Sequence, residues 1–446
     1  MSRLKKSTVL LEAMEDLHPR SIDLSLDRIY SLLQKLDDPQ NKLPPVVHIA
    51  GTNGKGSVLA FLQAILEAHG DKVHRFSSPH LVRFHERVHL ASNGSSKEIS
   101  ESNLIHYLQE VRRANGSCSI TFFEITTAMA LLAFSETPAD WCLLETGLGG
   151  RLDATNVVDK PAATIISPIS IDHTGFLGET ISKIAFEKAG ILKTEVPLFS
   201  ARQVDEAEDV IARRARLLNV PQVTCGGDFD AFEQNGRLVF STEEELIDLP
   251  MPRNLIGTYQ VENAGLALSC AKHLLGERLD IDALSKAMET AHWPARMQRI
   301  HPQALSQKLQ HDDEVWLDGG HNVGAAGVVA NTISELEERV PRPLHLVFGM
   351  MENKDVRGYL KQFIGLAELV VTVPIVSSEN GMDPDILADT AIEMGFEAES
   401  ARSIEEALQI SAEGRHSDVR VLICGSLYLA GHVLKLVELN NEQICP

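Results

Sequence analysis

The short apolar run Val46–Ala50, followed directly by the glycine-rich sequence Gly51–Ser57, constrains the fold more than any other part of the chain. The run is rich in β-branched residues, and the segment Val58–His69 after the glycines is mostly apolar, which predicts a strand, a turn and a helix in that order. Glycines let the backbone turn its N–H groups toward a bound phosphate, and the N-terminus of the helix adds further donors. We therefore predict a nucleotide-phosphate site, with an ordinary glycine-rich turn as the alternative.

The loop departs from the common phosphate-binding pattern G-x-x-x-x-G-K-[ST]. Ile49 stands where that pattern has its first glycine, and Gly56 separates Lys55 from Ser57. The chemistry of the pattern is retained, because Lys55 can reach the outer phosphates and the hydroxyl of Ser57 can bind a magnesium ion. The expected nucleotide-binding residues of the loop are Gly51, Thr52, Asn53, Gly54, Lys55, Gly56 and Ser57.

Length and composition limit the class of protein. A chain of 446 residues exceeds one ordinary core and predicts two domains. The net charge of −21 argues against non-specific binding to nucleic acid. We find no apolar run long enough to span a bilayer and no signal-peptide pattern at the start. The six cysteines lack C-x-x-C spacing, which favours reduced thiols and a cytoplasmic protein.

Predicted strands alternate with predicted helices through most of the chain. The first part has expected strands at 46–50, 73–76, 141–144 and 162–166, and expected helices at 101–113, 122–134 and 182–189. This alternation predicts an α/β fold with a parallel sheet and crossover helices on both faces. Residues 8–36 are expected to be helical with a break at 18–21, and residues 198–250 to contain a helix and short strands.

A change of composition at 292–297 marks the expected domain junction. Beyond it, strands are expected at 315–317, 344–348, 369–373 and 419–424, with helical stretches between them. The same alternation predicts a second, smaller α/β domain. We therefore expect domains at 1–293 and 294–446.

Polar side chains follow the predicted strands at the edge where ligands of parallel sheets collect. Glu145 ends one strand and is suited to hold a magnesium ion against phosphates, with the capping of the next turn as the alternative. His173, in the pair Asp172-His173, follows the next strand; it is either structural or part of a metal site, although imidazole is an unusual magnesium ligand. Residue chemistry alone favours Lys188 as a solvated lysine at a helix end.

The second half offers a similar strand end at Asp318, in the sequence Asp318-Gly-Gly-His-Asn322. Asp318 and His321 can hydrogen-bond ribose or phosphate, and the alternative is a helix N-cap. Arg296, after Trp293-Pro294, is the best basic candidate for a phosphate.

Together these motifs resemble the folylpolyglutamate synthase and dihydrofolate synthase family, within the wider Mur ligase superfamily. The resemblance covers essentially the whole chain. The matching segments, in order, are Gly51–Ser57 with its extra glycine, Ser77–Leu81 with Glu86-Arg87, Glu145–Asn156, Asp172-His173 with Gly178, Glu187–Ile191, Gln260 with Asn263-Ala264, Trp293–Arg296, Leu317–Asn322 and Gly425–Tyr428. The resemblance implies a P-loop-type parallel-sheet ATP-binding domain that carries a folate site, followed by a smaller Rossmann-like ligase domain.

The family resemblance also implies a reaction. ATP phosphorylates a carboxylate, the amino group of L-glutamate attacks the acyl phosphate, and an amide forms. The implied small-molecule substrates are ATP, L-glutamate and a reduced folate or dihydropteroate, with Mg²⁺ at two sites. The segment Arg151–Asn156 and the acidic sequence around Asp23 favour activity on both pterin substrates; a monofunctional folylpolyglutamate synthase is the alternative. We expect a monomer without nucleic-acid or membrane partners.

Residue roles follow from the same resemblance. Lys55, Lys188 and His173 are the implied catalytic residues, and Lys188 is the position that the family carbamylates. Ser57, Ser78 and Glu145 would hold one magnesium ion and His173 the second. Outside the loop, the implied ATP-binding residues are Asn263, Arg296, Asp318 and His321. The implied folate-binding residues are Ile22, Asp23, Thr121, Phe122, Phe123, Glu124, Leu152, Asp153 and Ala154.

Several positions depart from the family pattern. Tyr259 replaces a common His, Ala295 replaces a Gly, Met297-Gln298 replace Phe-Glu, and Gly320 and Val323 replace Ala and Pro. None of these changes removes a charged group that phosphoryl transfer needs, so we expect an active enzyme. Two rivals remain. A peptidoglycan-type Mur ligase would need an N-terminal domain for a UDP-linked sugar, for which the loop at residue 51 leaves little room. A non-catalytic nucleotide-binding switch would not need the polar groups of the second half.

Overall fold

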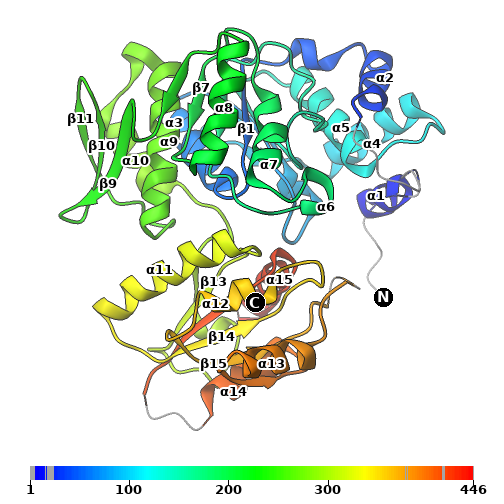
Figure 1. The fold of residues 1–446 in the computed structure, drawn as a ribbon. Coiled ribbons are helices and arrows are strands. Elements are labelled where there is room, and N and C mark those ends of the chain that lie inside the picture. The colour runs from blue at the N-terminus through cyan, green and yellow to red at the C-terminus, as the bar shows by residue number, and fades with distance from the viewer. Residues whose placement is uncertain are drawn as a thin grey trace. The chain divides into compact units, whose positions relative to one another are not determined.

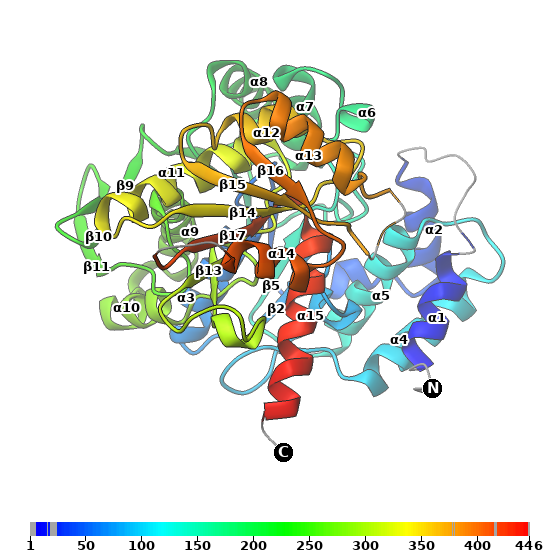
Figure 2. The same cartoon turned by 90° about the horizontal axis from the view of Figure 1, so that it is seen from below.

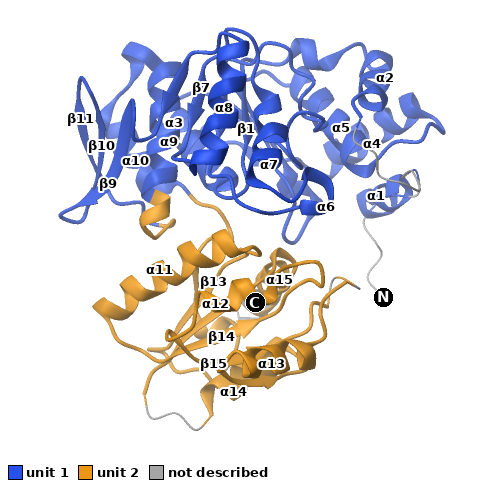
Figure 3. Cartoon of the chain, in the orientation of Figure 1, with its two compact units in different colours: residues 1–253, 261–291 blue, residues 254–260, 292–446 orange. Residues whose placement is uncertain are grey.

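The computed structural model describes residues 6–15, 17, 25–376, 378, 380–413 and 417–444. Ile22 and Asp23, two of the expected folate-binding residues, lie outside the described residues. The chain forms two compact units (Figure 3). Unit 1 consists of Met1–Arg253 and Val261–Ala291, and unit 2 of Asn254–Gln260 and His292–Pro446.

A mixed sheet of the order β4-β3-β2-β5-β1-β6-β7-β8 forms the centre of unit 1 (Figure 1). Its strands are β1 (Val46–Ala50), β2 (Val73–Phe76), β3 (Val88–Leu90), β4 (Lys97–Glu98), β5 (Trp141–Glu145), β6 (Ala163–Ile166), β7 (Leu198–Ser200) and β8 (Gln222–Thr224). All of β1 is buried, as its apolar sequence predicts for a central parallel strand. It pairs in parallel with β5 on one side and with β6 on the other. The chain therefore changes direction across the sheet at β1, and this is where open α/β sheets bind ligands.

Ten described helices belong wholly or mainly to unit 1. They are α1 (Lys6–Glu15), α2 (Asp27–Lys35), α3 (Lys55–Ala68), α4 (Glu101–Asn115), α5 (Phe122–Glu136), α6 (Thr174–Leu177), α7 (Ile181–Lys188), α8 (Asp205–Leu217), α9 (Thr258–Leu275) and α10 (Ile281–Thr290). A separate sheet of the order β11-β10-β9 is formed by β9 (Phe229–Gln234), β10 (Arg237–Thr242) and β11 (Leu246–Pro250).

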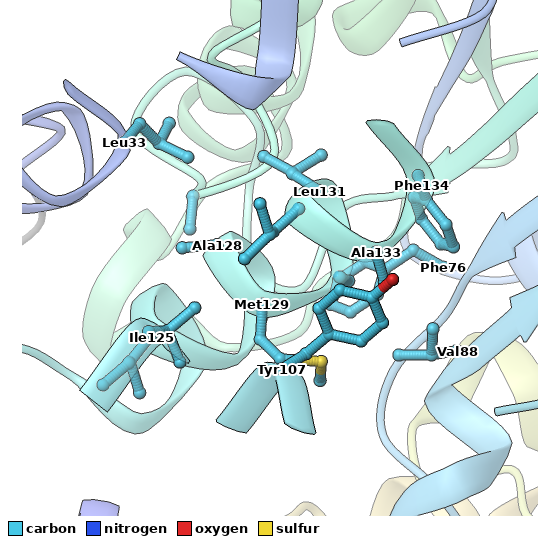
Figure 4. Close-up of a cluster of buried hydrophobic side chains, with 14 of the residues drawn as sticks. Leu33, Phe76, Val88, Tyr107, Ile125, Ala128, Met129, Leu131, Ala133 and Phe134 are labelled. Carbon is cyan, nitrogen blue, oxygen red and sulfur yellow. The ribbon is translucent and has the colours of Figure 1, made fainter. Parts of the chain in front are cut away.

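The largest apolar contribution to one core of unit 1 comes from α5. Its sequence is apolar nearly all round, and residues 124–134 are buried without interruption, as expected of a helix enclosed on every side. Figure 4 shows Ile125, Met129 and Phe134 of this helix among side chains of neighbouring elements, including Tyr107 of α4 and Phe76 of β2. This packing fixes the position of the N-terminus of α5, which carries Thr121–Glu124.

Unit 2 is built on one sheet of the order β12-β13-β17-β14-β15-β16, and Figure 2 shows β13 to β16 side by side in this order. The strands are β12 (Gln298–Ile300), β13 (Glu314–Leu317), β14 (Leu344–Phe348), β15 (Ala367–Thr372), β16 (Glu397–Ser400) and β17 (Arg420–Cys424). The helices are α11 (Val323–Arg339), α12 (Val356–Lys361), α13 (Pro384–Glu393), α14 (Ile404–Ala412) and α15 (Leu427–Ile444). Strands β13 to β17 pair in parallel, as the alternation predicts.

The sheets differ from the purely parallel arrangement expected from the sequence. In unit 1, β3 and β4 pair antiparallel at one edge, and in unit 2 β12 pairs antiparallel with β13. Short polar edge strands such as β4 and β16 lack the apolar run that identifies a buried strand, so the pattern does not reveal them. Within the described residues, no helix combines the length and apolar character needed to cross a membrane.

Candidate active site

The glycine-rich loop is held against the segment that follows β6. The N–H groups of Thr52 and Asn53 both donate to the carbonyl oxygen of Pro168, at 3.0 and 3.2 Å. Ser167 Oγ donates to the carbonyl oxygen of Asn53 at 2.7 Å, and Thr52 Oγ1 accepts the N–H of Ser170 at 3.1 Å. The first two N–H groups after Gly51 are thus used within the protein, which leaves phosphate binding to the residues that follow.

Those following residues form the start of α3, which has Gly54 as its N-cap. The first intrahelical bond runs from the N–H of Val58 to the carbonyl oxygen of Gly54 at 2.9 Å. The N–H groups of Lys55, Gly56 and Ser57 therefore have no intrahelical acceptor and point out of the helix end, together with the positive end of its dipole. This is the geometry that binds phosphate at helix N-termini.

Two glycines of the loop are required by conformation and by space. Gly51 has φ +153°, and a Cβ there would lie 1.8 Å from Ser167 Oγ. Gly54 has φ +84°, and a Cβ would lie 2.6 Å from Oδ1 of Asn263. The second contact also brings Asn263 of α9, predicted as an ATP-binding residue, directly against the loop.

Two lysines converge on one carbonyl oxygen of the loop. Nζ of Lys188 donates to the oxygen of Gly51 at 2.7 Å, and Nζ of Lys55 donates to the same oxygen at 3.1 Å. Lys55 Nζ also lies 3.9 Å from Oε1 of Glu145. The structure therefore brings together three residues that the sequence predicts for the site, from the loop, from β5 and from the end of α7.

Lys188 is buried, with 4% of its surface exposed, so its interpretation as a solvated lysine at a helix end is wrong. Burial, together with the nearby charge of Lys55, lowers the pKa of Lys188 to about 7, and Asp172 and Asp153 oppose this shift. A lysine that is partly neutral near pH 7 is a nucleophile, as carbamylation requires. The sequence gives no signal of this burial, because Lys188 is the last residue of α7, a position where a lysine usually lies in solvent.

Glu145 and Ser57 fit a divalent metal ion. Glu145 is buried, and its Oε2 accepts the N–H of Ser78, which precedes the cis peptide bond Ser78–Pro79, at 3.2 Å. Ser57 Oγ is buried and has no hydrogen-bond partner among the described residues. A buried hydroxyl without a partner and a buried carboxylate at a strand end are donors of the oxygen type that magnesium prefers. His173 caps α6 with φ +51° and is exposed, and its N–H donates to Oδ1 of Asp172 at 2.8 Å.

The expected folate-binding residues of unit 1 fall into two groups. Thr121 and Glu124 form a capping box at the start of α5, and Glu124 also pairs with Nε of Arg28 at 3.0 to 3.1 Å. The sequence does not predict Arg28 as a residue of this group, because its large separation from Glu124 along the chain gives no indication that the two side chains meet. Phe123 packs against Gly147, where a Cβ would lie 2.4 Å from its ring. Phe122 lies under the guanidinium of Arg87 at 5.9 Å. The group around Asp153 lies in the turn after β5.

In unit 2, Asp318 organises the turn that carries Arg296. Its Oδ2 accepts the N–H of Met297 at 2.9 Å, and its Oδ1 accepts the N–H of Gly320 at 2.7 Å. The N-cap of α11 is Asn322, so the interpretation of Asp318 as the helix cap is wrong. Burial raises the pKa of Asp318, and the charge of Arg296 opposes this shift.

Two residues of the Arg296 turn have left-handed backbone conformations, Ala295 with φ +54° and Met297 with φ +42°. The first of them is the position where the family pattern has glycine. Oε1 of Gln298 accepts the N–H of Ala295 at 2.9 Å, a role that a Glu in this position fills equally well. His321 lies in the same unit, on the turn before α11, and is half-buried.

Some residues that shape the site were missed by sequence reasoning. Ser167 and Pro168 hold the loop, and Gln203 holds them in turn, through Oε1 to the N–H of Ile169 and Nε2 to the oxygen of Ser167. Gln203 follows β7, so the rule that ligand-side residues follow parallel strands could have identified it.

Two family models and several curated proteins match the chain. Residues 49–271 match the family model "Mur ligase middle domain", and residues 301–436 match "Dihydrofolate synthetase, C-terminal domain". The chain is 34% identical, over 89% of its length, to the "Probable bifunctional folylpolyglutamate synthase/dihydropteroate synthase" of Halobacterium salinarum, and it covers 47% of that protein. The chain thus spans about half the length of this archaeal relative. It is 30% identical to the "Dihydrofolate synthetase" of Saccharomyces cerevisiae, over 93% of this chain and 98% of that one.

Solved structures are similar over the whole chain. The structure of "E.coli FolC in complex with DHPP and ADP" matches with a TM-score of 0.85 and 29% identity and covers 98% of both chains. A "bifunctional folylpolyglutamate synthase/dihydrofolate synthase with Mn, AMPPNP and L-Glutamate bound" matches with a TM-score of 0.83 and 30% identity, over 97% of this chain and 98% of that one. The loop, the strand-end carboxylate and the buried lysine lie in a fold shared along the full length of these proteins, and the chain belongs to the folylpolyglutamate synthase and dihydrofolate synthase family of Mur ligases.

Proposed function

We propose that the protein is an ATP-dependent ligase that joins the amino group of L-glutamate to a carboxylate of reduced folates, and also to that of 7,8-dihydropteroate. The observation that carries the proposal is the convergence of Lys55 and the buried Lys188 on the Gly51 oxygen, beside Glu145. The proposal is supported by family membership and by a related structure described as holding AMPPNP, Mn and L-glutamate.

The reaction would proceed in three steps. A carboxylate oxygen of the pterin substrate attacks the γ-phosphorus of ATP, the bond to the bridging oxygen breaks, and ADP leaves. The amino nitrogen of glutamate then attacks the acyl carbon and loses a proton. The tetrahedral intermediate expels inorganic phosphate and the amide remains. Lys55 and the N–H groups at the start of α3 would stabilise the negative charge on the transferring group.

The metal ion would supply neutralisation of phosphate charge and alignment of the reacting oxygens. We place one Mg²⁺ on Ser57, Ser78 and Glu145, and a second on His173, assisted by the carbamate of Lys188. Carbamylation changes a buried cation into an anionic oxygen donor, and the nearly neutral amine of Lys188 is suited to react with carbon dioxide.

Substrate contacts are assigned to both halves of the chain. ATP would be held by Gly51, Thr52, Asn53, Gly54, Lys55, Gly56 and Ser57 with Asn263 in the first domain, 1–293, and by Arg296, Asp318 and His321 in the second, 294–446. The folate or pterin would be bound by Ile22, Asp23, Thr121, Phe122, Phe123, Glu124, Leu152, Asp153 and Ala154. We propose a monomer in the cytoplasm, in keeping with the free thiols of the described cysteines.

The experiment that tests this function measures phosphate release with ATP, Mg²⁺ and L-glutamate, adding dihydropteroate or tetrahydrofolate in turn. Turnover with both acceptors supports a bifunctional enzyme, and turnover with tetrahydrofolate alone supports the monofunctional alternative. Absence of phosphate release with every pterin would overturn the proposal. Sedimentation velocity at working concentration tests the monomer.

A further inference from the structure

A buried hydrogen-bond chain connects the strand before the nucleotide loop with the turn after Glu145. His48, in β1, is completely buried, and its Nε2 lies 2.8 Å from Thr155 Oγ1. Thr155 Oγ1 donates to Oδ1 of Asp153 at 2.6 Å. All three residues are buried, and the proposed phosphoryl transfer gives no task to His48 or Thr155.

The direction of each hydrogen bond follows from the number of protons available. Asp153 also accepts the N–H of Thr155 at 3.0 Å and the N–H of Leu148 at 2.7 Å; burial raises the pKa of Asp153, and these hydrogen bonds oppose the shift. The single proton of the Thr155 hydroxyl is committed to Asp153, so the hydroxyl oxygen must accept from His48. The ring of His48 is therefore the tautomer with its proton on Nε2, and its Nδ1 has no partner among the described residues. Burial lowers the pKa of His48 to about 3, so the ring stays neutral.

The carboxylate of Asp153 in turn fixes the glycine-rich turn 146–150. Gly147 in this turn packs against the ring of Phe123, and a Cβ at Gly150 would lie 2.9 Å from the carbonyl oxygen of Lys188. The turn therefore lies between an aromatic residue of the candidate acceptor site and the backbone of the buried lysine. A displacement of the turn would therefore disturb its contacts with Phe123 and with the backbone of Lys188.

We propose that His48 and Thr155 are positioning residues for the pterin acceptor, which act by holding Asp153 and the turn 146–150. The inference rests on the proposed function, because it concerns the same acceptor site. Neither residue would contact the substrate.

The kinetic test replaces the hydroxyl and restores it. Thr155→Val keeps the side-chain volume but removes the hydroxyl that donates to Asp153 and accepts from His48. The KM for the pterin substrate, called the acceptor KM below, should rise about tenfold. The KM for ATP should stay within about twofold of wild type, because the loop contacts with Pro168 remain. Thr155→Ser keeps the hydroxyl and should restore the acceptor KM. His48→Leu should resemble Thr155→Val, whereas His48→Gln keeps a donor and should lie nearer to wild type.

The matched control is His74→Gln. His74 is also a buried strand histidine, but its Nε2 bonds to the carbonyl oxygen of Thr137, at the opposite end of α5 from Thr121. This variant should leave the acceptor KM unchanged. A merely structural role of Thr155 would lower Tm and raise both KM values in parallel, and that result would overturn the inference.

A readout without turnover separates this inference from the proposed function. In ¹⁵N-histidine spectra, the signal that disappears in His48→Gln should belong to a ring protonated on Nε2. This signal should not titrate between about pH 5 and 9, because burial keeps the ring neutral, whereas an unperturbed histidine would titrate in this range. A signal protonated on Nδ1 would overturn the hydrogen-bond chain, whatever the enzyme does. If the spectra agree but wild type releases no phosphate with any pterin, the proposed function fails and the acceptor role fails with it.

Discussion

Nζ of Lys188 and the carbonyl oxygen of Gly51 lie 2.7 Å apart, although they are separated by 137 positions in the chain. This hydrogen bond ties the end of α7 to the nucleotide loop, and Lys55 donates to the same oxygen. Burial, and after it the nearby positive charge of Lys55, lowers the pKa of Lys188.

Lys188 predicts a characteristic dependence of stability on pH. Its pKa is lowered to about 7 in the folded protein, so between about pH 7 and the unfolded value of about 10 the unfolded chain binds more protons. The contribution of Lys188 to the free energy of unfolding therefore increases as the pH rises through this window. Lys188→Met is neutral at every pH. In CO₂-free urea titrations, its free energy of unfolding minus that of wild type should be larger at about pH 6.5 than at about pH 9. A difference between the two proteins that is the same at both values would contradict the shift.

Removal of the Lys188 side chain should abolish most activity. We expect Lys188→Ala to lower kcat by about 100-fold or more, because in the proposed function a carbamate on Lys188 supplies a charged oxygen next to the transferring phosphate. Added acetate should restore part of the activity if a carbamate acts there, and Lys188→Arg should not recover it. Near-normal turnover of Lys188→Ala would show that no carbamate is needed.

Alanine substitutions at Gly54 and Gly70 distinguish the effect of backbone strain from the effect of a contact with the nucleotide loop. Both have left-handed φ values, +84° and +88°, but only Gly54 has a close neighbour, Asn263. Each change to alanine should cost about 1 kcal/mol of stability from the strained φ. Only Gly54→Ala should also weaken ATP binding, measured by calorimetry. Equal ATP affinity in both variants would contradict the placement of Asn263 against the loop.

Ala295, which stands where the family pattern has glycine, should lower the free energy of unfolding. Alanine in a left-handed conformation is disfavoured by about 1–2 kcal/mol, and glycine recovers this at an entropic cost of about 0.5–1 kcal/mol. Ala295→Gly should therefore raise the stability by up to about 1 kcal/mol in denaturant unfolding. Ala114→Gly, inside α4, is the control and should be destabilising by about 1 kcal/mol. A destabilising effect of Ala295→Gly would contradict the positive φ.

The parts of the fold that sequence predicts best are those with a strong local pattern. The strand Val46–Ala50 follows from an apolar run next to glycines, as does the helix predicted at Val58–His69, which in the structure begins three residues earlier, at Lys55; Glu145 follows from its place at the end of β5. The polar edge strands β4 and β16 have no such pattern, because their side chains face solvent. Residue types and spacing alone also left Lys188 as a surface lysine.

Contacts distant in sequence account for the rest. Lys188 contacts Gly51 and Gly150, which are distant from it in the sequence. The hydrogen bonds of Arg28 to Glu124 and of Gln203 to Ser167 likewise join separate elements. In these cases a single sequence carries no periodic signal, and only the resemblance to a family pointed to a role for Lys188 in the site.

The most direct test of the account is the product formed from dihydropteroate, ATP and L-glutamate, identified by mass spectrometry, with Lys188→Ala measured in parallel. We expect the wild-type protein to add one glutamyl residue per ATP consumed and the product to be absent without glutamate or Mg²⁺. We also expect tetrahydrofolate to gain glutamyl residues in the same way. ATP hydrolysis that does not depend on a pterin, or the absence of any glutamyl product with both acceptors, would contradict the account.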